Sequence, residues 1–250
     1  MKRLLVLFIV IVMMFSLLSG FVGATPETDP FADGPYYELK IAHVQNPGHS
    51  YQVGAKYLAE QLEKRSNGKI TAVIFPSSQL GGERDTVESA QMGTVDIAIT
   101  GAAPLANFNK NFTVFDFPGL FTSSEQASAV MDGEIGSGMF ESLDANGLVG
   151  LCYFDNGFFN TFNSKRDVTK IEDMVGLNIR TMENAVYMAT YKAFGSNPVP
   201  MAAGEVYTAL QTGTVDGFCL SFNAAYALKW YEQAKSVMYA DLFYCVTRLL

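Results

Sequence analysis

Histidine and the common catalytic motifs are scarce in this 250-residue sequence. It contains two histidines, His43 and His49, and they do not have the i, i+4 spacing of a zinc site on a helix. It also lacks a glycine-rich phosphate loop of the P-loop or dinucleotide type, and a nucleophile elbow of the form Gly-x-Ser-x-Gly. These absences favour a binding protein over an enzyme, and they predict neither a metal nor a cofactor.

Cysteine is also rare. Cys152, Cys219 and Cys245 lie far apart in apolar, strand-like runs with no histidine beside them. Metal ligands usually come in closer pairs, so we interpret the three as small buried hydrophobic residues. A disulfide between two of them stays open, because the sequence does not define the pairing.

Positive charge is limited too. The chain has 17 Lys and Arg against 25 Asp and Glu, a net charge of −8, and no Lys/Arg run. This balance argues against nucleic acid as a partner and gives no support to an anionic membrane surface.

The N-terminus has the three parts of a secretory signal peptide. Lys2 and Arg3 precede an apolar run from Leu4 to Leu18, and small residues end the segment at Ala24. We expect a signal peptide over residues 1–24, cleaved after Ala24, so that the protein is exported with a net charge of −10. The alternative is an uncleaved anchor, since residues 4–24 are just long enough to span a bilayer.

After a polar linker over residues 25–37, apolar strand patterns alternate with amphipathic helix patterns. This alternation predicts an α/β fold with a largely parallel sheet covered by helices. The predicted strands are 37–44, 70–75, 95–100 and 147–154, and the predicted helices are 50–69 and 83–92. In the glycine-rich segment 133–140, which follows a helical pattern, we expect the glycines to permit close helix packing.

One string occurs twice. "AQMGTVDIAIT" (Ala90–Thr100) and "LQTGTVDGFCL" (Leu210–Leu220) share Gln-x-Gly-Thr-Val-Asp at a distance of 120 residues. Gly93 and Gly213 suit the left-handed residue that ends a helix, after which Thr-Val-Asp begins a strand. A recurring helix-to-strand connection explains the match as well as a duplication does. Two similarly built lobes would enclose a cleft.

The segment 154–176 is rich in Asn, Gly and Thr and indicates a crossing between lobes. We place the boundary near Asn156, with lobe I over 38–156 and lobe II over 157–244. The final "FYCVTRLL" is interpreted as a strand that re-enters lobe I. Because no covering helix follows it, we expect that a C-terminal part is missing.

Arg180 lies in "GLNIRTMEN" (Gly176–Asn184), at the end of a predicted strand and next to apolar residues. A guanidinium group cannot lose its charge, so a buried arginine needs an anionic partner. Internal candidates are Asp155, Glu183 and Glu205. Because ligands of open α/β sheets bind at the carboxyl ends of strands, the other candidate is an anionic ligand.

Four blocks of the sequence carry a family resemblance. The run 176–217 closely resembles the signature region of solute-binding proteins of TRAP (tripartite ATP-independent periplasmic) transporters. The blocks 77–108, 112–121 and 156–168 resemble further family segments, and the match extends in order over residues 38–245.

The resemblance implies a periplasmic protein with two α/β lobes, hinge strands and a long helix. It also implies an organic acid held in the cleft, closure around it, and docking on a sodium-driven TRAP permease. We expect a monomer. The near-invariant arginine that binds the ligand carboxylate in the family falls on Arg180, whose planar fork matches a carboxylate with two parallel hydrogen bonds.

The sequence departs from the family pattern at two positions. Phe159 stands where many members have a second arginine, and Leu220 stands near the position of a ligand-binding asparagine. Asn223 is a candidate replacement for that amide. Because both changes replace polar groups with apolar ones, we expect a monocarboxylate with an apolar or aromatic body against Phe159, Leu220 and Phe222. Selection by other residues is the alternative.

Further candidate ligand contacts follow predicted strand ends. In lobe I these are Gln45, Asn46, His49, Gln79, Glu83, Gly101 and Ala102, and in lobe II they are Asn160 and Tyr207. Backbone amides near Gly101, at a helix start, are natural donors to an anion. His49 is otherwise a solvent-exposed residue at a helix start, His43 is interpreted as a core residue, and Tyr207 alternatively packs a helix.

Two other function classes remain. One is the receptor of an ATP-driven importer, against which the block 198–217 argues. The other is a secreted enzyme with an acidic cleft, for which no nucleophile, metal site or acid/base pair was found.

Overall fold

The structure is a computed structural model that describes residues 34–250. The expected signal peptide and its cleavage site lie outside the described residues. Residues 37–250 form one compact unit. None of the helices in this part of the chain is both long and apolar enough to cross a membrane.

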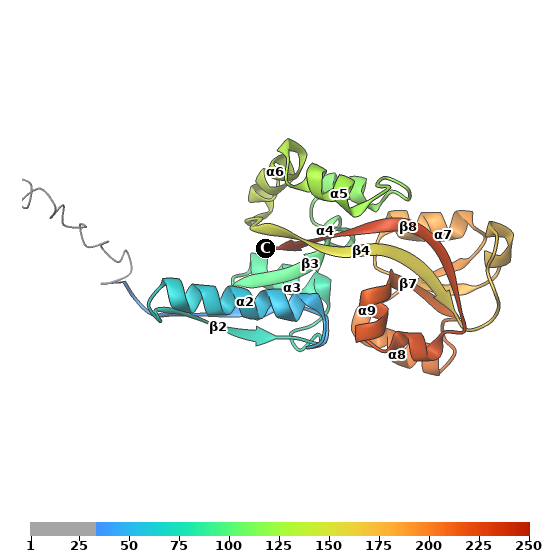
Figure 1. Ribbon diagram of the computed structural model, residues 1–250, viewed down its shortest axis with the longest axis horizontal. Helices are drawn as coiled ribbons and strands as arrows, with labels where there is room; N and C mark the ends of the chain where they lie inside the picture. Colours follow the sequence, from blue (N-terminus) through green and yellow to red (C-terminus); the bar gives the residue numbers. More distant parts are fainter. Residues whose placement is uncertain (1–33) are drawn as a thin grey trace, which may run out of the picture. The chain divides into compact units, whose positions relative to one another are not determined.

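An eight-stranded mixed sheet runs through this unit. Its order is β2-β1-β3-β8-β4-β7-β5-β6 (Figure 1). The strands are β1 (Tyr37–Ala42), β2 (Ile70–Phe75), β3 (Ile97–Gly101), β4 (Cys152–Asn163), β5 (Asn178–Thr181), β6 (Asn197–Pro200), β7 (Gly217–Ser221) and β8 (Ser236–Leu249). β1 is parallel to β2 and β3, and β5 is parallel to β6 and β7. The long strands β4 and β8 pair antiparallel in the middle.

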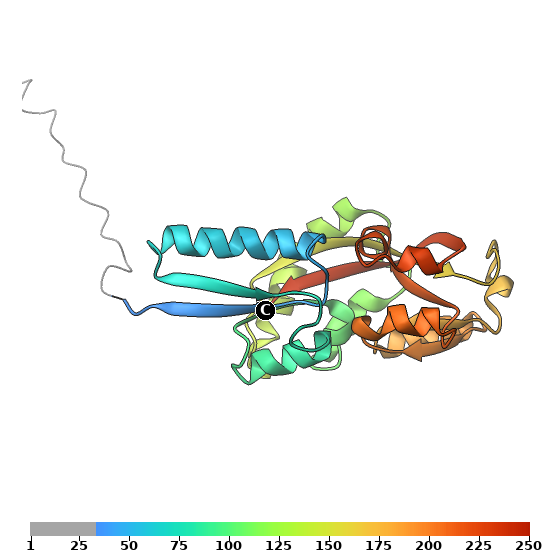
Figure 2. The ribbon, with the colours of Figure 1, turned by 90° about the horizontal axis from the view of Figure 1, so that it is seen from below.

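Helices connect the strands. They are α2 (Ser50–Arg65), α3 (Glu83–Gln91), α4 (Ala102–Leu105), α5 (Ser124–Met131), α6 (Glu134–Glu141), α7 (Ala185–Ala193), α8 (Ala203–Gln211) and α9 (Phe222–Ala227). Short 3-10 turns occur at η1 (Lys110–Asp116), η2 (Asp144–Asn146), η3 (Ile171–Met174) and η4 (Trp230–Gln233). Figure 2 shows α2 lying along β1 and β2. We refer to residues 37–151 as the first half and 164–235 as the second half, which β4 and β8 join.

The two halves have the same arrangement of strands. From one edge of the sheet the order is β2-β1-β3-β8, and from the other edge it is β6-β5-β7-β4. β2, β1 and β3 of the first half therefore correspond to β6, β5 and β7 of the second. The repeated sequence string lies at matching places in it. Gly93 and Gly213 end α3 and α8 with φ of 70° and 72°, so the predicted left-handed glycines are confirmed.

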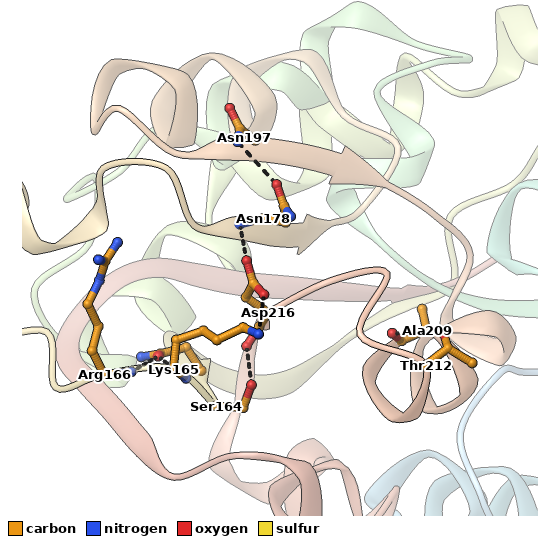
Figure 3. A network of polar contacts seen from close by, with 9 residues as sticks. Ser164, Lys165, Arg166, Asn178, Asn197, Ala209, Thr212 and Asp216 are labelled. Atoms are coloured by element: carbon orange, nitrogen blue, oxygen red, sulfur yellow. Dashed lines mark hydrogen bonds and ion pairs between the residues drawn. The ribbon is translucent and has the colours of Figure 1, made fainter.

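The aspartates of the repeated string also have one role. Asp96 Oδ2 accepts a hydrogen bond from the backbone N–H of Lys40 on β1 (2.8 Å), and Asp216 Oδ2 accepts one from Asn178 on β5 (2.9 Å). Figure 3 shows that Asp216 also faces Lys165, at 3.3 Å from Nζ to Oδ1. Each aspartate therefore ties the start of one parallel strand to its neighbour, which explains why the string recurs.

The bounds of the strand predicted over 147–154 are wrong, and part of the segment predicted to cross between the lobes is strand. β4 begins at Cys152 and continues to Asn163, so the expected boundary at Asn156 falls inside a strand. The pairing of β4 with β8 shifts register between Asp155 and Phe158, and Gly157 has a φ of 74°. A β-bulge at this point lets Asn and Gly occur within a strand.

Side chains in the interior bear out most other expectations. His43 is buried, and its Nε2 is 2.9 Å from Gln52 Oε1, although it follows β1 rather than lying within it. The three cysteines are free. Cys219 and Cys245 are buried as predicted, but Cys152 is exposed because it begins β4 at the surface. A Cβ on Gly136 of α6 would lie 1.7 Å from Met131 O, so this glycine does permit close backbone packing.

Candidate functional site

Arg180 lies near the carboxyl end of β5, between Val199 of β6 and Phe218 of β7. Only 3% of the residue is exposed. Its Nε and Nη2 donate to the backbone oxygen of Met201, at 3.1 and 2.8 Å. The guanidinium carbon is 5.5 Å from the ring centre of Trp230, the single tryptophan of the sequence, which fits a cation–π contact.

No carboxylate pairs with this guanidinium group among the described residues, where the ion pairs are Arg84–Glu88 and Lys165–Asp216. None of the three internal candidates is thus its partner. Burial lowers the pKa of Arg180 to about 10, and the charge of Glu83 opposes this fall. The group is therefore charged at neutral pH. A buried charge without an ion pair is costly, so a carboxylate brought to this place is stabilised.

Glu83 has the largest effect of the charged groups that act on the pKa of Arg180. It is the first residue of α3, and its Oε1 accepts a hydrogen bond from the Gly101 N–H (3.1 Å). Burial raises the pKa of Glu83, while the Gly101 N–H and the positive charge of Arg180 act in the opposite direction. Because Gly101 donates to Glu83, its amide is already engaged within the protein.

Two cavities meet at Arg180 and Glu83. The smaller, of about 20 Å³, has a polar wall of Gln45, Tyr51 and Asn156 and an apolar wall that includes Phe159, Leu220 and Trp230. The larger, of about 360 Å³, extends past Met182 toward Pro104, Glu183 and Glu205. An anion at Arg180 would therefore lie between hydrogen-bonding groups and apolar side chains.

Comparison with known proteins decides the family. Residues 41–250 match the family described as bacterial extracellular solute-binding protein, family 7. The chain belongs to this family. Its resemblance to TRAP solute-binding proteins is confirmed, and the family and the solved relatives below are binding proteins.

Three relatives illustrate the match. A solute-binding protein of Verminephrobacter eiseniae is 41% identical over 180 residues, which are 72% of this chain and 53% of the relative. A TRAP periplasmic solute-binding protein from a Polaromonas species, solved with bound D-erythronate, is 40% identical with a TM-score of 0.83, covering 85% of this chain and 70% of that one. The sugar acid binding protein DctPAm of Advenella mimigardefordensis, solved with galactonate, is 30% identical with a TM-score of 0.84, covering 86% and 70%. The chain thus spans about half the length of the first relative.

In this solute-binding protein the fold brings together six of the residues predicted from the sequence. The smaller cavity is lined by Gln45, Glu83, Gly101, Phe159, Arg180 and Leu220. Gln45 follows β1 and the others come from α3, β3, β4, β5 and β7, and the sheet order places the ends of these strands near one another.

The other candidates lie elsewhere. Asn160, Phe222 and Asn223 line a separate cavity of about 390 Å³. The Asn160 amide is used within the fold, since it donates to Asp241 Oδ1 (3.0 Å) and accepts from the Ala240 and Asp241 N–H groups.

Four more candidates do not line the two cavities at Arg180. Ala102 is the buried first residue of α4. Gln79 is exposed, and the Tyr207 hydroxyl donates to Glu232 (3.2 Å). The expectation of a solvent-exposed His49 is wrong: it is fully buried at the start of α2, where its Nδ1 accepts from the Tyr51 N–H (3.2 Å).

Sequence reasoning missed Tyr51 and Asn156 of the polar wall, and Trp230. Asn156 links two other side chains: its Nδ2 donates to the Tyr51 hydroxyl and its Oδ1 accepts from Ser221 Oγ, both at 3.3 Å. Gln45 Oε1 is buried with no hydrogen-bond partner among residues 34–250. Gln45 was a candidate from the sequence because it follows a strand. Tyr51 and Asn156 gave no such signal, since helix and strand periodicity do not reveal such partners.

Proposed function

We propose that this chain forms the ligand-binding part of an exported TRAP solute-binding protein that captures a hydroxylated monocarboxylate. The observation that carries the proposal is Arg180, buried and charged at the meeting point of two cavities and without an ion pair to any residue from 34 to 250. Its Nη1 edge is available for a ligand carboxylate while Nε and Nη2 are held by Met201. The planar fork then fixes the orientation of the acid.

The polar wall changes the ligand class expected from the sequence. Phe159 and Leu220 do line the smaller cavity, but they face it together with Gln45, Tyr51 and Asn156. Phe222, expected in an apolar pocket, lines a different cavity. Because a buried acceptor such as Gln45 Oε1 gains from a hydroxyl donor, the body of the ligand is hydroxylated rather than aromatic. D-erythronate and galactonate, bound by the two solved relatives, have this chemistry.

A single carboxylate fits the charges of the site. Of the cations lining the two cavities, Arg84 is exposed and paired with Glu88, which leaves Arg180. Glu83, Glu183 and Glu205 also line the larger cavity and would repel a second carboxylate. We therefore favour a monocarboxylate over a dicarboxylate.

A ligand panel followed by thermal unfolding tests this function. D-erythronate and galactonate should raise the unfolding midpoint, and at 100 times the dissociation constant the gain is about 2.7 kcal/mol. Succinate and phenylpyruvate should have little effect. Stabilisation by phenylpyruvate alone would support the apolar or aromatic ligand expected from the sequence, and stabilisation by succinate alone would support a dicarboxylate.

Arg180→Ala should weaken the binding of the acid that stabilises best by about 2 to 5 kcal/mol, since it removes one partner of a buried charge pair. Arg84→Ala is the matched control, because Arg84 lines the same larger cavity but is exposed and paired. Equal affinities of the two variants would contradict the role of Arg180.

Delivery to a sodium-coupled TRAP permease completes the proposal and rests on the family. Its test is uptake of labelled D-erythronate into liposomes that contain the permease. Uptake should require both this protein outside and an inward sodium gradient, whereas uptake driven by ATP would place the protein with another importer class.

A further inference from the structure

Two asparagines occupy matching positions in the two halves. Lys40 and Asn178, whose N–H groups bind Asp96 and Asp216, are equivalent residues of β1 and β5. Asn46 lies six residues after Lys40 and Asn184 six residues after Asn178. Each asparagine therefore follows the equivalent strand and precedes the next helix, α2 or α7.

The side-chain oxygens of the two asparagines act locally and alike. Asn46 Oδ1 accepts from the Gly48 N–H (3.0 Å), and Asn184 Oδ1 accepts from the Val186 N–H (2.9 Å), in both cases two residues further on. Asn184 also accepts from Tyr187 and caps α7. These contacts fix the direction of each amide.

The side-chain nitrogens reach across to the opposite half. Asn46 Nδ2 donates to the backbone oxygen of Ala227, at the end of α9. Asn184 Nδ2 donates to the backbone oxygen of Ala103 in α4 (3.0 Å) and to Asp116 Oδ2 (2.7 Å). α4 and α9 are themselves equivalent, since they follow β3 and β7. Each asparagine thus donates to a backbone carbonyl of the short helix in the opposite half, to the last residue of α9 in one direction and to the second residue of α4 in the other.

The acceptors suit this role. α4 has four residues and α9 has six, and the carbonyl groups of a terminal helical turn lack partners within the helix. An amide from the other half satisfies such a carbonyl at little cost. If the halves separate, water replaces the amide, so the contact can form and break.

Both contacts border the ligand site. Gln45 and Leu228, the neighbours of Asn46 and Ala227, line the smaller cavity. Glu183 and Pro104, the neighbours of Asn184 and Ala103, line the larger one. Neither asparagine lines these two cavities itself.

We propose that Asn46 and Asn184 are a matched pair of positioning residues that hold the two halves together over a ligand at Arg180 and so set the rate of its release. The inference rests on the proposed function in one respect, the place of the ligand. Separation of the halves would widen the site between the two contacts, and it breaks both of them.

Substitution by aspartate isolates the cross-half bond. Asn46→Asp and Asn184→Asp keep Oδ1 for the turn and the helix cap, where Asp and Asn are equally good. They replace the Nδ2 donor with an oxygen that faces a carbonyl. The matched control is Asn197→Asp, because the Asn197 amide donates to Asn178 Oδ1 (3.1 Å) within the second half, as Figure 3 shows.

The first readout is the dissociation rate of D-erythronate, followed in a stopped-flow instrument by Trp230 fluorescence. Each aspartate variant should release it about tenfold faster, the equivalent of one ordinary hydrogen bond, while the association rate changes little. Asn197→Asp should match the wild type. If the two asparagines served only the local fold, the aspartate variants would have a lower melting temperature, but D-erythronate would not dissociate faster at an unchanged association rate. If the new carboxylate next to Asp116 prevents Asn184→Asp from folding, the release rate of Asn46→Asp alone tests the proposal.

The second readout needs no ligand. Spin labels at Lys56 on α2 and Lys192 on α7, both exposed, report the distance between the halves in a Cys152→Ser background. The aspartate variants should broaden this distance distribution and the control should not. An unchanged distribution with unchanged release rates overturns the proposal. A broadened distribution in a protein that does not bind D-erythronate contradicts the ligand class and supports the paired contacts.

Discussion

Arg180 combines a charge with an interior position. A buried charge without an ion pair costs stability, and replacement of such groups by apolar residues of similar size is often neutral or stabilising by about 1–4 kcal/mol. Two hydrogen bonds to Met201 are lost in Arg180→Met, which offsets part of that gain. In the absence of ligand we expect the free energy of unfolding of this variant, measured in urea titrations, to be no more than about 1 kcal/mol below that of the wild type.

The same variant should lose stabilisation by D-erythronate. Arg84→Met, at an exposed and ion-paired arginine, should keep it. A ligand-free Arg180→Met protein that is several kcal/mol less stable would mean that the guanidinium group serves the fold rather than the ligand.

His49 gives the fold a dependence on acid. Burial, followed by the nearby His43, lowers its pKa to about 4, while the Asn156 side chain acts in the opposite direction. Burial also lowers the pKa of His43. In the unfolded chain both rings take up a proton near pH 6.5. The folded state is therefore fully stable above that pH and loses stability as the pH falls from 6.5 to about 4.

For His49 this loss is at most ~3 kcal/mol, from the difference between the folded and unfolded pKa values. Urea titrations at pH 7.5 and 4.5 measure it. His49→Asn keeps a side chain that caps α2 and removes the titrating ring, so its loss between the two pH values should be smaller. His49→Asn and wild-type proteins that lose the same stability would show that His49 does not titrate in this range.

On the scale of elements, α6 holds two glycines with opposite surroundings. A Cβ at Gly136 would lie 1.7 Å from Met131 O, whereas a Cβ at Gly138 would meet no atom within 4 Å. Gly136→Ala forces the backbone of α5 and α6 apart and should cost more than about 2 kcal/mol, as overpacking commonly does. Gly138→Ala should stabilise by about 0.5–1 kcal/mol, the usual gain of alanine in a helix.

Chemical denaturation of the two variants measures this difference, with far-UV circular dichroism as the check that the overall helix content is unchanged. The test is whether Gly136→Ala is less stable than Gly138→Ala. If Gly136→Ala proves as stable as Gly138→Ala, the close approach of α6 to Met131 is not maintained in solution.

Elements with regular periodicity were predictable from the sequence. The strand over Ile70–Phe75 and the helix that begins at Glu83 appear where the pattern places them, because apolar spacing, Pro76 and the glycines mark their ends. β4 was not predictable. Its Asn156 and Gly157 are typical of a turn, and only pairing with β8, some ninety residues away, makes the bulge a stable part of a strand.

The site shows the same division. Arg180 was predictable because a permanent charge beside apolar residues violates the pattern of a strand. Gln45 was predictable from its place after a strand, whereas Tyr51 of α2 and Asn156 of β4 were not, because their convergence with Gln45 depends on the strand order rather than on any local signal. A ligand class derived from Phe159 and Leu220 alone therefore omitted half of the cavity wall.

At the scale of the whole molecule, β4 and β8 join the two halves of the sheet. β8 pairs with β3 through Thr247–Leu249, and β4 pairs with β7 through Phe159–Asn163. The two strands pair with each other along most of their length. Neither half can unfold without exposing strand edges of the other, so residues 37–250 should unfold in one cooperative transition.

Calorimetry tests this cooperativity, because in a two-state transition the calorimetric and van't Hoff enthalpies agree. D-erythronate should shift the single peak upward without splitting it. Two peaks, of which D-erythronate shifts only one, would mean that the halves unfold separately and that β4 and β8 do not couple them. In that case paired contacts such as those of Asn46 and Asn184 would be the main link between the halves, and the double aspartate variant should separate the peaks further.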